Sequence, residues 1–197
     1  NVAELSSNGG SLFISEADSI TINETSTISV QRVDSTTGLT VTTDALQSNI
    51  VSSGDVVITT VNGSITTAVT NGSITATGNI LLSSNDTDND DTFSITLNSD
   101  VVSSSGNISI NSDYDLVQNG NITSTTAGKT IELQAGNDIT MGDGTLTSVT
   151  NSGNILLNAG NNVSIETINA GTADITITAG GSLIDTDAVD STNSDVD

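Results

Sequence analysis

Apolar residues recur along the chain in pairs one position apart, usually with a polar residue between the two. The pairs include Ile20/Ile22, Ile28/Val30, Leu39/Val41, Val56/Ile58, Ile80/Leu82, Ile95/Leu97, Ile108/Ile110, Ile131/Leu133, Ile139/Met141, Ile155/Leu157, Val163/Ile165 and Ile175/Ile177. A period of two is typical of short strands with one buried face, because successive side chains of a strand point to opposite sides. No comparable pattern appears at helical spacing. The sequence therefore predicts an all-β protein.

Glycine and asparagine pairs separate these predicted strands. Gly-Asn, Asn-Gly, Gly-Asp and Asn-Asn tolerate a positive φ, so they turn the chain sharply. The turns recur too often for a sandwich of long strands, whereas a parallel β-solenoid needs short strands joined by short corners. Proline is absent, as expected where nearly every backbone N–H is needed by a neighbouring coil. We expect a parallel β-helix, right-handed by the rule for parallel crossovers.

Segments that begin at glycine can be laid over one another, which indicates internal repeats. The clearest are residues 136–152, 153–170 and 171–188, and looser repeats cover 54–77, 78–105, 106–119 and 120–135. The first glycines of consecutive segments from Gly106 to Gly171 are 14, 16, 17 and 18 residues apart, which indicates coils with corners of variable length. We expect solenoid repeats over residues 54–188, an N-terminal cap or irregular first coils over 1–53, and an acidic C-terminal tail over 189–197.

The recurring G-N-I-x-L/I and A-G-x-x-x-x-I sequences, clearest in residues 153–188, carry a family resemblance. They resemble the β-helix repeats of filamentous-haemagglutinin-type adhesins and related large bacterial surface exoproteins. The resemblance covers roughly residues 54–188. It implies a secreted, long, right-handed parallel β-helix that serves in adhesion, surface structure or contact with other cells. No secretion module or receptor-binding domain is recognisable, so the resemblance assigns no activity to a particular residue.

The charged residues are strongly unbalanced. The chain of 197 residues has 24 Asp and Glu against 2 Lys and Arg, with a formal net charge of −22. Such a charge repels phosphate backbones and anionic lipid headgroups, so we expect no nucleic-acid partner. No apolar run approaches the ~20 residues of a membrane span, so we expect no membrane insertion. The 50 Ile, Val and Leu residues, about a quarter of the chain, argue against disorder.

The densest acidic cluster spans residues 85–91. Within it, Asp86, Asp88 and Asp90 have the alternate spacing that can direct hard oxygen ligands at one Ca²⁺ ion. Asp91 stands where an EF-hand loop needs glycine, and Leu97 stands where it needs glutamate, so the segment is not an EF-hand. The sequence leaves two interpretations open, which are an exposed acidic corner loop and a calcium site. No other cofactor is expected.

We expect no enzymatic activity. The chain has no His and no Cys, so it offers no imidazole base, thiol nucleophile or ordinary zinc site. Some parallel β-helices cleave polysaccharides with paired carboxylates, but adjacent residues such as Asp90 and Asp91 face opposite ways on a strand. A lyase also needs a cationic group, and Arg32 and Lys129 are the only candidates.

A solenoid coil gains stability only from the coils on either side, so both ends expose strand edges and apolar side chains. No amphipathic capping helix is visible in the sequence at either end. Either the chain is a stretch of a longer adhesin that continues as a rod, or the open ends stack head to tail. We therefore expect a non-catalytic structural protein, and stacking of its copies into a surface filament or adhesive stalk is the main hypothesis. Arg32 and Lys129 are the only tryptic sites and aromatic residues are few, which favours an extracellular or cell-surface location. An ordered acidic tail would indicate a contact with a neighbouring subunit.

Two alternatives remain. An adhesin segment of the same fold would bind a glycan or another cell-surface ligand through a coil face, although Phe13, Phe93 and Tyr114 are the only aromatic residues available to stack on a sugar. A different all-β architecture would have a donated terminal strand complete a neighbour's sandwich. In that case residues 1–30 would supply the donated or acceptor strands.

Overall fold

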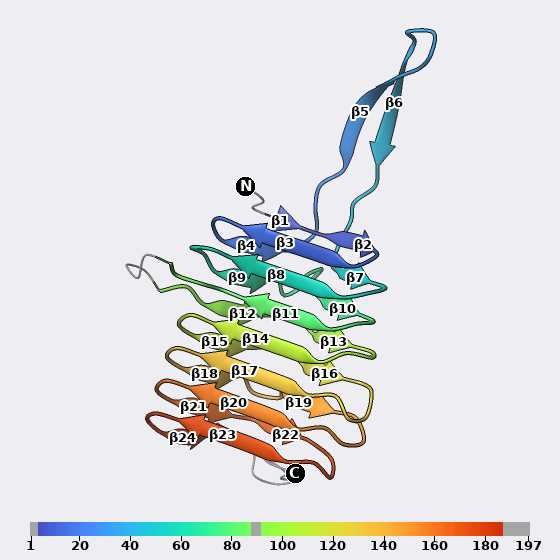
Figure 1. The fold of residues 1–197 in the computed structure, drawn as a ribbon. Helices are drawn as coiled ribbons and strands as arrows, with labels where there is room; N and C mark the ends of the chain where they lie inside the picture. Colours follow the sequence, from blue (N-terminus) through green and yellow to red (C-terminus); the bar gives the residue numbers. More distant parts are fainter. Residues whose placement is uncertain (1–3, 88–91, 187–197) are drawn as a thin grey trace.

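The structure, a computed structural model, describes residues 4–87 and 92–186 and confirms the predicted parallel β-solenoid (Figure 1). These residues form three parallel sheets and no helix. Sheet A contains β1 (Glu4–Leu5), β4 (Ile20–Ile22), β9 (Ile65–Thr67), β12 (Ile95–Leu97), β15 (Leu116–Gln118), β18 (Ile139–Met141), β21 (Val163–Ile165) and β24 (Leu183–Asp185). Sheet B contains β2 (Ser7–Gly9), β7 (Ile50–Ser52), β10 (Ile74–Ala76), β13 (Val101–Ser103), β16 (Ile122–Ser124), β19 (Leu146–Val149) and β22 (Thr167–Asn169). Sheet C contains β3 (Leu12–Glu16), β8 (Val56–Thr60), β11 (Ile80–Ser83), β14 (Ile108–Ser112), β17 (Ile131–Ala135), β20 (Ile155–Ala159) and β23 (Ile175–Ala179).

Each turn of the solenoid runs through one strand of sheet A, one of sheet B and one of sheet C. Ile108 pairs with Ile80 on one side and with Ile131 on the other, which makes turns of 28 and 23 residues. The spacing of 14 to 18 residues between glycines is therefore shorter than a turn. The reason is that glycine occupies more than one corner of a turn. The segments 106–119 and 120–135 together hold β14 to β17, which is one complete turn and the strand that follows it.

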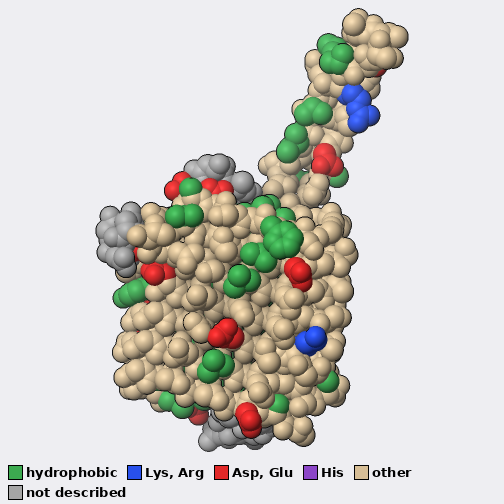
Figure 2. Space-filling view, in the orientation of Figure 1, with side chains coloured by type: hydrophobic (Ala, Val, Ile, Leu, Met, Phe, Trp, Pro, Cys, Tyr) green, Lys and Arg blue, Asp and Glu red, His purple; other side chains and the backbone are tan. Residues whose placement is uncertain are grey.

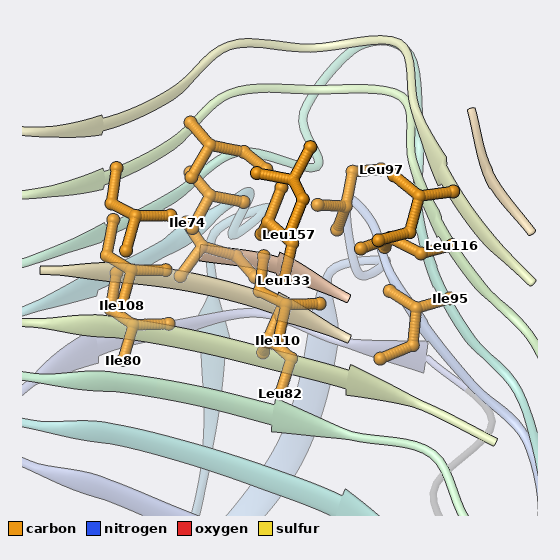
Figure 3. Close-up of a cluster of buried hydrophobic side chains, with 14 of the residues drawn as sticks. Ile74, Ile80, Leu82, Ile95, Leu97, Ile108, Ile110, Leu116, Leu133 and Leu157 are labelled. Atoms are coloured by element: carbon orange, nitrogen blue, oxygen red, sulfur yellow. The ribbon is translucent and has the colours of Figure 1, made fainter. Parts of the chain in front are cut away.

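The inward-facing member of each apolar pair stacks on its counterpart in the next turn. In sheet C, one column contains Ile80, Ile108, Ile131 and Ile155, and a second contains Leu82, Ile110, Leu133 and Leu157. All eight side chains are buried, and Figure 3 shows members of both columns facing those of sheet A across the core. A single turn cannot bury these side chains by itself, so the stability of each turn comes from its neighbours.

An antiparallel hairpin interrupts the first turns. It consists of β5 (Ile28–Val33) and β6 (Leu39–Asp44), and we call residues 28–44 the arm. The arm is inserted between β4 and β7 and projects beyond the first turn (Figure 1). The prediction of half-buried strands was wrong here, because every side chain in β5 and β6 is exposed. Period-two alternation predicts a strand but does not say whether another element covers it.

The strands on either side of the arm belong to the solenoid. β3, β4 and β7 pair in parallel with β8, β9 and β10 of the same chain, in the registers that the later turns continue. Residues 4–22 and 50–52 thus contribute to all three sheets. This pairing within one chain argues against the sandwich in which residues 1–30 supply donated or acceptor strands. The acidic tail, residues 189–197, lies outside the described residues.

Polar side chains at the corner before sheet C form a second ladder, outside the core. The residues that precede the strands of sheet C from β8 onward are, in order, Asp55, Asn79, Asn107, Thr130, Asn154 and Asp174. Asn107 Oδ1 accepts the backbone N–H of Thr130 at 3.0 Å, and Asn79 Oδ1 accepts that of Asn107 at 2.9 Å. The asparagine of the repeated Gly-Asn-Ile sequence therefore links successive turns.

The glycine of the same sequence allows the turns to approach closely. A Cβ atom added to Gly106 would collide with the backbone carbonyl of Gly78 in the preceding turn. An inward-facing serine adds to this corner, because Ser103 Oγ donates to the Gly78 carbonyl at 2.7 Å and accepts the Gly106 N–H at 2.8 Å. The motif that resembles adhesin repeats thus has a direct structural role at the corner.

We predict that Asn107→Ala lowers the free energy of unfolding by about 1 kcal/mol, because it removes the acceptor for the Thr130 N–H and hydroxyl. Chemical denaturation followed by circular dichroism measures the change. Asn158→Ala is the matched control, since Asn158 is an exposed, outward-facing asparagine within β20 and not at the corner before it. Equal effects of the two substitutions would contradict a stabilising corner ladder.

Candidate functional site

The acidic loop after β11 holds the residues that the sequence suggested for calcium. Asp86 lies in this loop, where it forms an antiparallel bridge with Asn62 of the corner before β9. The backbone N–H of Thr87 donates to Asn62 Oδ1 at 2.9 Å, which fixes the beginning of the loop. Asp88 and Asp90, the other two proposed ligands, lie outside the described residues, as does Asp91. The calcium site therefore stays a prediction.

The fold brings Asp113 close to Asp86. Burial raises the pKa of the Asp113 carboxyl, and the negative charge of Asp86 raises it further, while the Phe93 N–H lowers it. No local sequence pattern indicates this pair, because the two residues follow β11 and β14 in successive turns of the solenoid. Within residues 4–87 and 92–186, no group of three or more His, Cys, Asp or Glu side chains is arranged to hold a metal ion.

We predict that Asp113→Asn stabilises the protein at neutral pH. The pKa of Asp113 is raised in the folded state, so ionising this carboxyl destabilises the fold once the pH exceeds the folded pKa. Below the ordinary pKa of a carboxyl group, Asp113 is protonated in both states and the advantage of the variant disappears. Thermal denaturation at several pH values measures this difference. A constant advantage across that range would contradict the electrostatic explanation.

The two ends of the described solenoid expose apolar side chains of the core columns. At the C-terminal end, β22, β23 and β24 have a described neighbour on one side only. Leu183 continues the inward column of Val163 but is 55% exposed, and Ile175 and Ile177 are only partly buried. At the other end, Leu5, Leu12 and Ile14 are also only partly buried. Both ends thus combine unpaired strand edges with uncovered aliphatic side chains.

The outer face of sheet C carries a shallow groove of about 440 Å³ near its first corner. Its lining includes Ser109, Glu132, Asn154, Leu156, Asp174 and Thr176. The groove offers hydroxyl, amide and carboxylate groups around one aliphatic side chain, a set that can hydrogen-bond a sugar. None of the lining residues is aromatic, so the groove has no stacking platform.

The two cationic residues lie in different parts of the molecule. Arg32 lies on β5 of the arm, and Lys129 precedes β17 at a corner of the solenoid body. Acidic side chains are scattered over the face of the body that Figure 2 shows. Within the described residues, Arg32 and Lys129 are therefore not brought together beside a pair of carboxylates. The catalytic pair considered from the sequence, Asp90 and Asp91, lies outside them.

No protein-family model, curated protein or solved structure matches this chain. The residues that the structure describes include no helix long and apolar enough to cross a membrane. The architecture and its surfaces are therefore the basis for assigning a function.

Proposed function

We propose that the protein is a non-catalytic structural subunit whose copies stack end to end, so that the three sheets continue from one copy into the next. The observation that carries this proposal is the exposure of the core columns in the terminal turns. Leu183, Ile175 and Ile177 are uncovered at one end, and Leu12 and Ile14 at the other. Because the contact joins two different surfaces, repetition extends it into a filament.

The strand edges support the same arrangement. In sheet C, β3 and β23 are the outermost strands, and both are five residues long. The two edges also present the same kind of inward residues, since Leu12 and Ile14 of β3 stand in the columns that end at Ile175 and Ile177. A stacked copy would therefore extend each column with another aliphatic residue and satisfy backbone groups along the edge.

A surface filament or adhesive stalk outside the cell is the setting that we propose for this assembly. The acidic composition, the scarcity of tryptic sites and the resemblance of the Gly-Asn-Ile repeats to those of filamentous-haemagglutinin-type adhesins support it. The net charge of −22 opposes lateral contact between filaments. Salt or divalent cations such as Ca²⁺ would therefore change bundling more than they change the fold.

Glycan binding at the groove on sheet C is the second candidate. The polar groups of Glu132, Asn154 and Asp174 around Leu156 favour it, and the absence of aromatic residues from the lining weighs against it. This function needs no self-association. A population of single short rods under all solution conditions would favour it over stacking.

We predict that the protein forms filaments at micromolar concentration and that Leu183→Lys disperses them. The substitution places a charge in the apolar end surface, which opposes burial of that surface. It also makes the net charge less negative, which lowers the repulsion between copies, so a loss of assembly cannot come from the change in net charge. Sedimentation velocity and negative-stain electron microscopy measure the outcome.

Val69→Lys is the control for this substitution. Val69 is 77% exposed on a corner loop between β9 and β10, away from the C-terminal turn, and the change in charge is the same. We expect this variant to form filaments as the unmodified protein does. Discrete single rods of the unmodified protein at every salt and Ca²⁺ concentration would contradict the proposed function.

A further inference from the structure

The arm is a hairpin with apolar side chains on both of its faces. Asp34 orders its tip, because one carboxylate oxygen accepts the N–H of Thr36 at 2.7 Å, the Thr36 hydroxyl at 2.7 Å and the N–H of Gly38 at 2.9 Å. These hydrogen bonds lower the pKa of Asp34. Ile28 and Val41 lie on opposite faces of the two-stranded sheet and are 63% and 65% exposed.

A two-stranded hairpin with no other element against it is marginally stable in water. Val30, Val33 and Leu39 are also more than half exposed, so the solenoid of the same chain leaves the apolar surface of the arm uncovered. Figure 2 shows the arm standing clear of the body, with apolar, acidic and basic side chains on its surface. The arm thus has the features of a contact element that another surface covers.

We propose that the arm binds a second copy of this chain, along the corners between sheets A and B in the last turns of that copy. This inference rests on the proposed end-to-end stacking. The position of the arm identifies the surface. The arm is inserted between β4 and β7, which is the corner between sheets A and B, and projects beyond the first turn (Figure 1).

In a stack that continues the three sheets, the same corner of the neighbouring copy lies next along the axis. In the last described turns, this corner carries one acidic residue per turn. Asp143 lies between β18 and β19, Glu166 between β21 and β22, and Asp185 at the end of β24. The arm carries Arg32, which is one of only two cations in the chain. The arm also carries Asp34 at its tip and Asp44 at its base, so the charge complementarity is local to Arg32, which offers one ionic contact to this corner.

The reach of the arm fits this arrangement. Arg32 is four residues beyond the start of β5, which corresponds to about 13 Å at 3.3 Å per residue. Neighbouring turns of a solenoid are about 4.8 Å apart, so Arg32 reaches across roughly three turns of the stacked copy. These are the turns that carry the acidic corner residues. Ile184, an outward-facing residue of β24 beside this corner, is 42% exposed and offers an apolar contact.

Glu166 adds an independent sign that this corner is incomplete. Glu166 as a whole residue is 6% exposed, and its Oε1 accepts the backbone N–H of Gly144 at 3.1 Å. Oε2 is buried and has no hydrogen-bond partner among the described residues. A buried carboxylate oxygen without a donor is costly, and a nearby guanidinium group reduces that cost.

Photo-crosslinking within the assembled protein tests the proposal. A benzoylphenylalanine at position 30 replaces Val30, which is exposed on the face of the arm that carries Arg32, and mass spectrometry maps the residues that it attaches after irradiation. We expect covalent dimers joined to residues 142–145, 166–167 or 183–186 of another chain. Electron microscopy of the same sample reports stacking separately.

The outcomes are distinguishable. Filaments whose cross-links lie elsewhere, or within one chain, would overturn the role of the arm and leave the stacking intact. A sample without filaments would overturn the stacking and, with it, this inference. Cross-links from the arm to an unrelated protein added to the sample would likewise overturn the role of the arm. The same holds if filaments form but contain no cross-links.

Charge reversal supplies a second measurement. We expect Arg32→Glu to weaken self-association about tenfold, because it replaces an attraction to the acidic corner by a repulsion. Lys129→Glu makes the same change in charge on the solenoid body and should leave the association constant within about twofold. Addition of Asp143→Arg to Arg32→Glu should restore part of the loss. Equal weakening by Arg32→Glu and Lys129→Glu would overturn the inference.

Discussion

The hydrogen bonds that run along the solenoid axis between successive turns are the interaction on which the rest of the structure depends. Every strand of sheets A, B and C pairs in parallel with a strand of another turn, and these pairings fix which side chains stack. Once Ile108 pairs with Ile80 and Ile131, its neighbours in both apolar columns follow, because the side chains of each strand alternate between core and surface. The asparagine ladder at the corner extends the same axial bonding from main chain to side chain.

The solenoid fold could be predicted from the sequence alone because both of its requirements leave local signals. These requirements are strands with one apolar face and corners where the turns approach closely. Pairs such as Ile155/Leu157 show the inward face of each strand, and Gly153 with Asn154 marks a corner where the turns approach closely. The length of a turn leaves no such signal, since glycine occurs at several corners. The glycine spacing therefore underestimates the number of residues in a turn, because that number depends on how corners of unequal length are accommodated.

The surfaces that bear on function were less predictable, for a physical reason. Ile28/Val30 in the arm have the same alternation as Ile20/Ile22 in the core, and only the tertiary arrangement makes the first pair exposed and the second buried. Asp113 approaches Asp86 because two turns lie side by side, which no local motif encodes. Patterns within a strand thus predict which residues share a face, whereas the burial of that face and the contacts between turns depend on the tertiary arrangement and the register.

The same axial bonding makes the ends of the described solenoid the surfaces most suited to association, since the last described turn has a described neighbour on one side only. Hydrogen exchange of the backbone amides before and after assembly tests this claim most directly. If copies stack end to end, amides of β3 and β23 become protected on assembly, while those of β14, which already has neighbours on both sides, are unchanged. Assembly that leaves β3 and β23 exchanging as in single rods, and protects an outer face of the solenoid instead, would contradict this stacking.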